Sequence, residues 1–411
     1  MSVRLLTGLA LCLTLVACDS GDEFTGPTSS GTGGAGGTAG SGGSQIGGGG
    51  TGSGTGGGGA VGGSGGFGGA PTCPGSAPGC VNDWAGQFNN PGDTDGVGQA
   101  AQFEAMSDIA GDGTYLYVTA HNAIRRIEIA SATVTTWAGT SGQNAHVDAQ
   151  GNTARFGWVA GIVSDGTTVW VTDEGNSCIR AIDIATATVS TLAGSVGNPG
   201  VADGTGAAAQ FTGPRGLTHD GTYLYLAESG NHAIRRIDPT NGAVVTVAGG
   251  NGSGLTEGAG SAAQFAAPRY VWAAGAGDLY VGDTENHRVR HVVVTGTSNP
   301  TSTVSTAFGS SQGHQDGVAT SAQFDRLRGV AYDGSLLVVA DSDNCVLRTA
   351  DLGGNTVATL AGQPGSPQTS THGVGIYGAA GFNKPMHVYY EPTSGDLFIT
   401  EDSVIRRMIY P

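Results

Sequence analysis

Three arginines, Arg215, Arg269 and Arg328, occupy one position in consecutive copies of a pattern that recurs along this chain. A guanidinium group is planar and always charged, so it holds carboxylates and phosphates through paired hydrogen bonds. Three such groups brought together repel one another unless negative charge lies between them. We favour neutralisation by the acids of the preceding loops, which are Asp203, Glu257 and Asp316. The functional hypothesis is a site for an anionic group, such as a carboxylate or a sugar acid.

Three large side chains stand one residue further along, where the other copies have glycine: Asp108, Tyr270 and His387. We assign them to the same ligand-binding site. The histidines nearest to expected first strands or turns are His121, His219 and His387, and no two of these have the spacing of metal ligands. We therefore predict no metal site, no cofactor and no set of catalytic residues.

A repeating unit must position these side chains, and a phenylalanine marks it. The copies fall at Phe103, Phe156, Phe211, Phe265, Phe324 and Phe382, which are 53 to 59 residues apart. A period of this length is typical of solenoids and propellers. In the third copy four short strands fit residues 216–219, 223–227, 233–237 and 244–248, with turns at Asp220-Gly221 and Asn241-Gly242. We predict an all-β fold, a six-bladed β-propeller with four-stranded antiparallel blades.

Counting strands predicts how the ring closes. The sixth copy ends before its fourth strand, whereas residues 81–86 match the fourth strand of the first copy, residues 134–139, and precede that copy. Pairing this N-terminal strand with the last three strands would complete the sixth blade and remove an open sheet edge.

One turn of each copy carries a recognisable signature, an acid followed after two intervening residues by Asn-His-x-Ile/Val-Arg. It is clearest in residues 228–235 and 283–290, and degenerate copies occur at 121–125, 173–180, 341–348 and 401–406. The repeat resembles the NHL family of six-bladed propellers, and the resemblance covers residues 81–411. It implies a rigid ring whose loops and central channel carry the function.

The acid and the Asn of this turn could suggest calcium, most of all at residues 341–344. A calcium ion needs six to eight converging oxygens, and the turn does not supply them. We expect structural roles instead: the acid accepts hydrogen bonds from turn amides and pairs with the Arg, and the Asn tolerates a left-handed backbone. Cys178 and Cys345 lie in this turn of the second and fifth copies, and we predict small turn residues there, not a disulfide.

The amino-acid composition disfavours a helical protein and a nucleic-acid-binding protein. The 411 residues include 76 glycines, which disfavour helices because each Gly costs a helix interior about 1 kcal/mol relative to Ala. Lys and Arg number 17 against 33 Asp and Glu, a formal net charge of −16. This charge disfavours nucleic acid as a partner.

The N-terminal residues predict export and anchoring. Residues 1–17 are typical of a lipoprotein signal peptide, and Leu15-Val16-Ala17-Cys18 resembles the bacterial lipobox, which would make Cys18 the lipidated first residue. Residues 18–72 form a predicted disordered linker, since 31–70 contain 24 Gly in 40 positions. Residues 73–80 would be a short loop closed by a Cys73–Cys80 disulfide.

Together these features predict a lipid-anchored protein of the bacterial cell envelope that faces the periplasm or the cell exterior. Its monomeric propeller would be a non-catalytic binding platform for a protein, peptide or glycan. Two alternatives remain. Propellers of similar outline include lactonases, streptogramin lyases and peptide-amidating lyases, which work in the central channel with a metal or a Tyr, Arg and His set. A structural scaffold of the envelope would need no discrete ligand.

Overall fold

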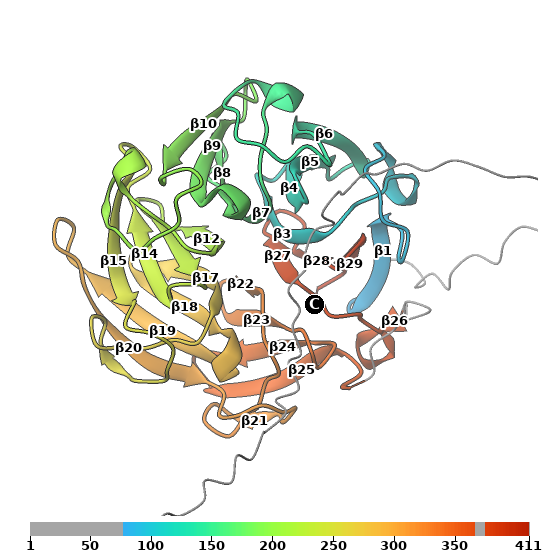
Figure 1. Cartoon of the computed structure of the whole chain (residues 1–411). Coiled ribbons are helices and arrows are strands. Elements are labelled where there is room, and N and C mark those ends of the chain that lie inside the picture. Colours follow the sequence, from blue (N-terminus) through green and yellow to red (C-terminus); the bar gives the residue numbers. More distant parts are fainter. Residues whose placement is uncertain (1–76, 366–374, 411) are drawn as a thin grey trace, which may run out of the picture. The chain divides into compact units, whose positions relative to one another are not determined.

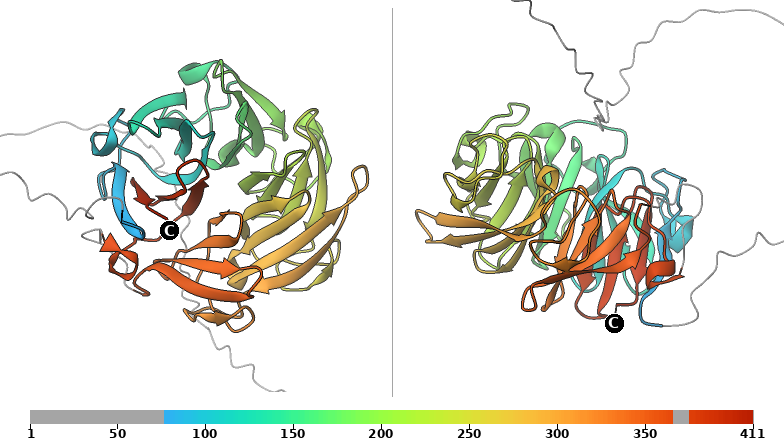
Figure 2. Two further views of the ribbon diagram at one scale, coloured as in Figure 1. Left: turned by 180° about the vertical axis from the view of Figure 1, so that it is seen from behind. Right: turned by 90° about the horizontal axis from the view of Figure 1, so that it is seen from below.

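Six antiparallel sheets stand around a central channel like the blades of a propeller (Figure 1). The structure is a computed structural model that describes residues 77–365 and 375–410. Within these ranges the only helical elements are six single 3-10 turns. The all-β six-bladed propeller predicted from the sequence is confirmed. Figure 2 shows the same ring from behind and edge-on.

Each blade starts with a strand at the channel, where neighbouring first strands pack against one another. These inner strands are β3 (Met106–Gly111), β7 (Val159–Ser164), β12 (Pro214–His219), β17 (Pro268–Gly275), β22 (Val330–Tyr332) and β27 (His387–Glu391).

The second strand of each blade returns along the first through a tight turn. These strands are β4 (Tyr115–Ala120), β8 (Thr168–Asp173), β13 (Leu224–Glu228), β18 (Asp278–Asp283), β23 (Leu336–Asp341) and β28 (Asp396–Thr400).

The third strand carries the signature Arg. The third strands are β5 (Ala123–Glu128), β9 (Cys178–Asp183), β14 (Ala233–Ile237), β19 (Arg288–Thr295), β24 (Val346–Asp351) and β29 (Val404–Met408).

The fourth strand lies toward the rim. The fourth strands are β6 (Thr133–Gly139), β10 (Val189–Ala193), β15 (Ala243–Gly249), β20 (Thr301–Phe308), β25 (Thr356–Gly362) and, in the sixth blade, β1 (Cys80–Gly86).

Five of the six blades have a fifth strand that the sequence did not predict. It is only two residues long and pairs with the outer edge of the fourth strand. Two residues are too few for an alternating pattern, so hydrophobic periodicity could not reveal it. These edge strands are β2 (Gly96–Val97), β11 (Gly204–Thr205), β16 (Gly258–Ala259), β21 (Gly317–Val318) and β26 (Gly375–Ile376).

The N-terminal strand closes the ring as predicted. β1 pairs antiparallel with β29, from Val81 opposite Met408 to Gly86 opposite Val404. Figure 1 shows it in blue beside the red strands of the sixth blade. The chain ends of the described propeller are thus held in one sheet, and β1 covers the edge of β29 that would otherwise be open.

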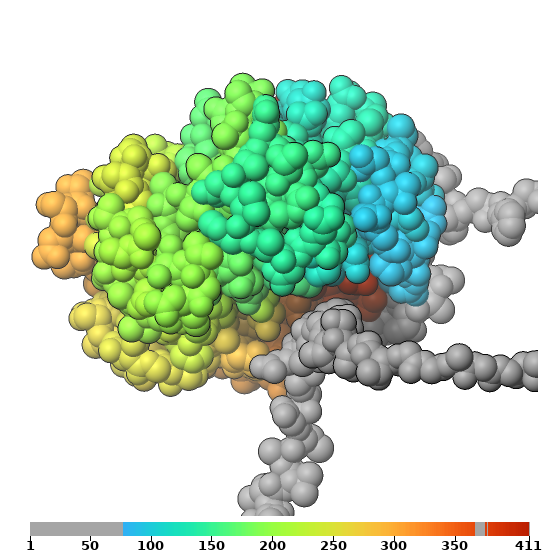
Figure 3. Space-filling model, turned by 45° about the horizontal axis from the view of Figure 1, so that its top comes forward, coloured from blue at the N-terminus to red at the C-terminus, as the bar shows by residue number. Residues whose placement is uncertain are grey.

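The core is divided into six apolar clusters, each between two adjacent blades. The marker phenylalanines lie in these clusters and are 0% exposed. The face in view in Figure 3 shows neighbouring blades packed closely against each other. Burial between blades, rather than within one, explains why the unit repeats: a single blade cannot cover both faces of its own sheet.

Each marker Phe also makes a cation–π contact with a signature Arg. The guanidinium carbon lies 4.9 to 5.5 Å from the ring centroid in all six copies. In the third blade Arg235 donates to Glu228 at 2.7 Å and to Asp203 at 2.8 Å. The charge is therefore buried with both aromatic and ionic partners, which confirms the structural role predicted for the motif.

The left-handed backbone of this turn falls one residue later than predicted. In the second to fifth blades the residue after the signature Asn has the positive φ, which is 54° at His232 and 60° at Cys345. The Asn itself is used as a donor: Asn231 Nδ2 bonds to the Gly200 carbonyl and to Glu228. Its amide thus joins the turn to the preceding loop, and the next residue bends the chain.

Candidate functional site

The inner strands begin at one mouth of the channel, and the three predicted arginines meet there. Arg215, Arg269 and Arg328 line a cavity of ≈ 20 Å³. The other blades contribute Ser107, Ala160 and Met386 at the same position. A cavity of this volume has room for about one water molecule, so a larger ligand would lie across the mouth. We call this group of three side chains the arginine mouth.

Counter-charge at the arginine mouth comes from an unexpected place. Arg215 Nη2 lies 2.9 Å from Glu174 Oε1, an acid of η3 (Glu174–Asn176) in the preceding blade. Glu285, in η5 (Thr284–Asn286), is 3.0 Å from Arg326. Both acids belong to turns between second and third strands, which reach toward the channel.

The loop acids that the sequence analysis offered as partners of the three arginines contact other residues instead. The prediction that Asp203, Glu257 and Asp316 neutralise the arginines is therefore wrong. Asp203 and Asp316 pair with signature arginines, at 2.8 and 2.7 Å respectively, and Glu257 accepts hydrogen bonds from Thr306. The physical reason is their place: each immediately precedes a two-residue edge strand at the outer side of its blade. Nearness in sequence to the arginine position therefore did not mean nearness in space.

Arg269 is a buried charge beside two other positive charges of the mouth. Burial lowers the pKa of its guanidinium to about 10, and the neighbouring charges of Arg328 and Arg215 add to the effect. Burial also raises the pKa of the Glu174 carboxyl, against the opposing pull of Arg215 and Arg269. An anion placed among the three arginines would relieve their mutual repulsion.

The three larger predicted residues fill the channel beneath the mouth. His387 Nδ1 lies 2.7 Å from Asp108 Oδ1, a close polar contact without the alignment of a hydrogen bond. The rings of Tyr270 and His387 stack, with centroids 4.7 Å apart. Tyr270 Oη crosses from the fourth blade to donate to the Ser107 carbonyl of the first, at 3.3 Å. We call Asp108, Tyr270 and His387 the channel plug.

The plug is almost closed to solvent. Asp108 is 1% exposed, and both Tyr270 and His387 are 7% exposed. Asp108 accepts hydrogen bonds from the amides of Ile109 and Ile162, so it also joins the first and second blades. Burial raises the pKa of Tyr270. The plug therefore separates the arginine mouth from the rest of the channel.

Glycine in the other three blades makes room for the plug. A Cβ added to Gly329 would lie 2.4 Å from His387 Cδ2, and one added to Gly216 would lie 2.8 Å from Tyr270 Cδ1. A Cβ added to Gly161 would instead lie 2.2 Å from the Arg215 carbonyl oxygen of the next inner strand. These distances are too short for real contacts. Glycine at this position in three of the six copies is thus a packing requirement of the channel.

A wider cavity opens at the other end of the inner strands, and the sequence did not predict it. Its volume is ≈ 410 Å³, and all six blades line it. Its aromatic wall consists of His219, Trp272, Tyr332, Tyr389 and Tyr390, and Tyr270 and His387 of the plug also line it. We call this cavity the aromatic vestibule. Aromatic residues near the ends of several first strands were the available signal.

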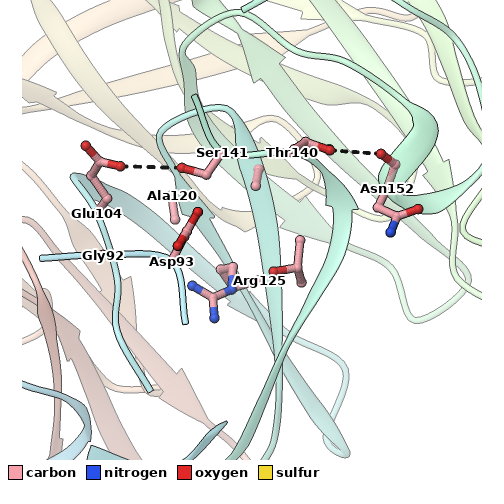
Figure 4. Close-up of a pocket in the computed structure, with 11 residues that line it drawn as sticks. Gly92, Asp93, Glu104, Ala120, Arg125, Thr140, Ser141 and Asn152 are labelled. Carbon is pink, nitrogen blue, oxygen red and sulfur yellow. Dashed lines mark hydrogen bonds between the residues drawn. The ribbon is translucent and has the colours of Figure 1, made fainter. Parts of the chain in front are cut away.

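The first blade departs from the others in its signature turn, and a third cavity results (Figure 4). The turn there has only His121 and Asn122 between β4 and β5, and the signature acid is missing. Among the described residues, Arg125 consequently has only the outer acid Asp95 as an ion-pair partner, at 2.8 Å. A cavity of ≈ 240 Å³ lies beside it, and Ala120 and Asp93 are among its lining residues.

The cysteines agree with the predictions where the structure describes them. Cys178 and Cys345 are buried and free. Cys80 is disulfide-bonded. Its predicted partner Cys73, the lipidation candidate Cys18, and residues 1–72 lie outside the described residues, so lipidation, the linker and the Cys73–Cys80 pairing stay predictions.

Metal-binding clusters and membrane-spanning helices are both absent from the described ranges. In residues 77–365 and 375–410, no group of three or more His, Cys, Asp or Glu side chains is placed to hold a metal. Over the same ranges, no helix has the length and apolar character needed to span a bilayer.

Known proteins with a similar sequence match only part of this chain. No family model matches the chain. Protein SUPPRESSOR OF QUENCHING 1, chloroplastic, from Arabidopsis thaliana is 34% identical over 134 residues, which are 30% of this chain and 12% of that protein. NHL repeat-containing protein 2 from Bos taurus is 29% identical over 180 residues, 40% of this chain and 25% of that protein. The chain thus spans a quarter or less of the length of these curated relatives.

Solved structures share the fold over a larger part of the chain. A protein of unknown function from Bacteroides thetaiotaomicron has a TM-score of 0.59 at 19% identity, covering 80% of this chain and 75% of that one. An auxiliary nutrient binding protein from Bacteroides ovatus has a TM-score of 0.59 at 14% identity, covering 80% and 76%. At these identities the likeness shows the architecture alone.

Proposed function

The chain is a six-bladed propeller of NHL repeats, and from this premise we propose that it is a binding platform whose ligand presents an anionic group to the arginine mouth. The ligand would be a protein, a peptide or a glycan that carries a carboxylate, such as a sugar acid. The rigid ring holds the three guanidinium groups in place, so little ordering is needed when the ligand binds.

One observation carries this proposal. Three arginines from three adjacent blades line one mouth, and one of them, Arg215, pairs with Glu174. The rest of the chain is strongly acidic, with a formal net charge of −16, so the mouth is a local exception. Positive charge gathered in this way attracts an anionic group and orients it through the planar guanidinium forks. The auxiliary nutrient binding protein that shares the fold is consistent with a binding role.

We further propose that the platform is anchored in a bacterial cell envelope by lipid on Cys18, with residues 18–72 as its tether. In cells that express the full chain, a Cys18→Ser variant should move from the membrane fraction to the soluble fraction. Retention in the membrane fraction at the level of the unmodified chain would contradict this anchoring.

A thermal-shift panel tests the binding site. The full-length protein would be mixed with trigalacturonate, citrate and a Glu-rich peptide, and we expect at least one of them to raise the melting temperature. A variant with Arg215, Arg269 and Arg328 all replaced by Ala should lose that shift.

The matched control removes the same charge outside the mouth, by replacing Arg126, Arg155 and Arg288 with Ala. It should keep the shift. A shift that survives in the mouth variant, or one that both variants lose equally, would count against the arginine mouth as the binding site.

A second candidate, an enzyme of the central channel, is favoured by one observation. The plug brings a carboxylate, an imidazole and a phenol into contact, and these are groups that can move protons. A substrate would have to reach them from the aromatic vestibule, because the cavity on the other side holds about one water molecule. Turnover of a lactone or a uronate glycan that His387→Ala abolishes and Arg269→Ala retains would favour this candidate.

A further inference from the structure

The aromatic vestibule has the size and lining of a small-molecule site. Its volume of ≈ 410 Å³ falls within the range of about 300–1,000 Å³ that is usual for such sites. Aromatic side chains from the third to sixth blades form its wall, and the plug separates it from the arginine mouth. A ligand seated there is therefore independent of an anion at the other mouth.

The charges of the wall exclude an ionic ligand. The described lining includes no Lys or Arg, and its one carboxylate belongs to Asp333. That carboxylate is already engaged: Oδ1 accepts from the amides of Ser335 and Leu336, and Oδ2 accepts from Tyr410 Oη at 2.8 Å. The residues described around the vestibule thus include no Lys or Arg, and both oxygens of the Asp333 carboxylate already accept hydrogen bonds, in contrast to the arginine mouth.

Polar groups on the wall exclude a purely apolar ligand. Trp272 Nε1 is buried and has no hydrogen-bond acceptor among the described residues. A buried donor without an acceptor is unfavourable, and a ligand oxygen would satisfy it once the Trp272 ring turns its N–H toward the cavity. At the rim, Tyr332 Oη donates to the Gly334 carbonyl at 2.7 Å, which leaves its own oxygen able to accept from a ligand hydroxyl.

We infer that the aromatic vestibule binds a neutral pyranose, as the end unit of an uncharged oligosaccharide. A pyranose has apolar C–H faces that lie flat against aromatic rings, and a rim of hydroxyls that donate and accept hydrogen bonds. It matches a wall of Trp and Tyr rings that includes a Tyr hydroxyl and has no Lys or Arg among the described residues. The vestibule would give the platform a second ligand class at the mouth opposite the arginines.

Calorimetric titration of the full-length protein tests this inference. The probes are cellohexaose, maltohexaose and chitohexaose, all neutral, with trigalacturonate as the acidic comparison. We expect at least one neutral hexasaccharide to bind saturably. Trp272→Ala and Tyr332→Ala should each weaken that binding at least tenfold, and an unchanged melting temperature in either variant would show that the core is intact.

Two control variants separate the vestibule from the rest of the propeller surface and from the arginine mouth. Tyr223 lies outside the vestibule, 4.2 Å below the Arg236 guanidinium, so Tyr223→Ala should bind the oligosaccharide as the unmodified protein does. Arg269→Ala should also bind it unchanged, since the arginine mouth is a separate site. With these variants, the proposal for the vestibule can be refuted without refuting the proposal for the arginine mouth, and the reverse is also possible.

Three results would overturn the inference. The first is that no neutral hexasaccharide binds. The second is that binding persists undiminished in both Trp272→Ala and Tyr332→Ala. The third is that trigalacturonate, and no neutral probe, binds in a manner that Trp272→Ala abolishes, because the vestibule would then select charge.

Discussion

At the scale of single residues, each blade is held by one buried arginine whose partners differ from blade to blade. Arg235 is 1% exposed and pairs with Glu228, which is 0% exposed, as well as with Asp203. Arg125 is 2% exposed, and its one ion-pair partner among the described residues is Asp95, which is 49% exposed. Removing Arg235 leaves the buried carboxylate of Glu228 without its partner. Removing Arg125 leaves only the half-exposed carboxylate of Asp95 without one.

This difference predicts unequal costs for the same substitution. Arg235→Met should lower the free energy of unfolding by about 3–5 kcal/mol, the usual cost of stranding a buried charge. Arg125→Met should cost clearly less, because Asp95 remains hydrated. Urea unfolding of the two variants checks this, and equal losses would contradict the role given to the inner acid.

The inner acid of the fifth blade predicts a dependence on pH. Burial raises the pKa of Asp341 from 3.8 to about 6, so the folded state holds this proton more tightly than the unfolded chain does. Its contribution to stability is then complete below pH 3.8 and is lost as the pH rises through about 6. The free energy of unfolding, relative to an Asp341→Asn variant, should fall over that window. A difference that stays flat or rises with pH would show that the folded pKa is not raised.

At the scale of elements, the sequence predicted where strands lie along the chain better than it predicted which residues lie close together in space. The four expected strands of the third copy correspond to β12, β13, β14 and β15 within two residues at each end. Glycine turns and alternating residues act locally, so they can be read from the chain. The partner of Arg215 could not be found in this way, because Glu174 comes from another blade and only the ring brings the two together. The aromatic vestibule was missed for the same reason.

The closing strand gives a prediction at this scale. Deleting residues 81–86 removes nearly all of β1, including Val81 of the core between the fifth and sixth blades, and exposes the edge of β29. The melting temperature should fall by several degrees, or folding should fail. Deleting residues 18–64 instead is the control and should leave the melting temperature unchanged. An unaltered melt after loss of 81–86 would contradict closure by this strand.

At the scale of the whole molecule, the six-bladed ring brings single-residue differences between the repeats together, so that the two ends of the channel differ in character. Every inner strand runs in the same direction, so the first residues of all six strands meet at one end and the last residues meet at the other. Arginine at the first position of three adjacent blades makes one mouth cationic, and aromatic residues at the last positions make the other neutral. The plug of Asp108, Tyr270 and His387 keeps the two apart.

Anomalous diffraction from crystals of the full-length protein soaked in selenate tests the cationic mouth most directly. Selenate is a tetrahedral oxyanion that guanidinium groups bind as they bind other oxyanions. The strongest selenium peak should lie within hydrogen-bond distance of the guanidinium groups of Arg215, Arg269 and Arg328. Selenate peaks elsewhere, with none at these three side chains, would contradict the claim that the ring gathers them to hold an anion.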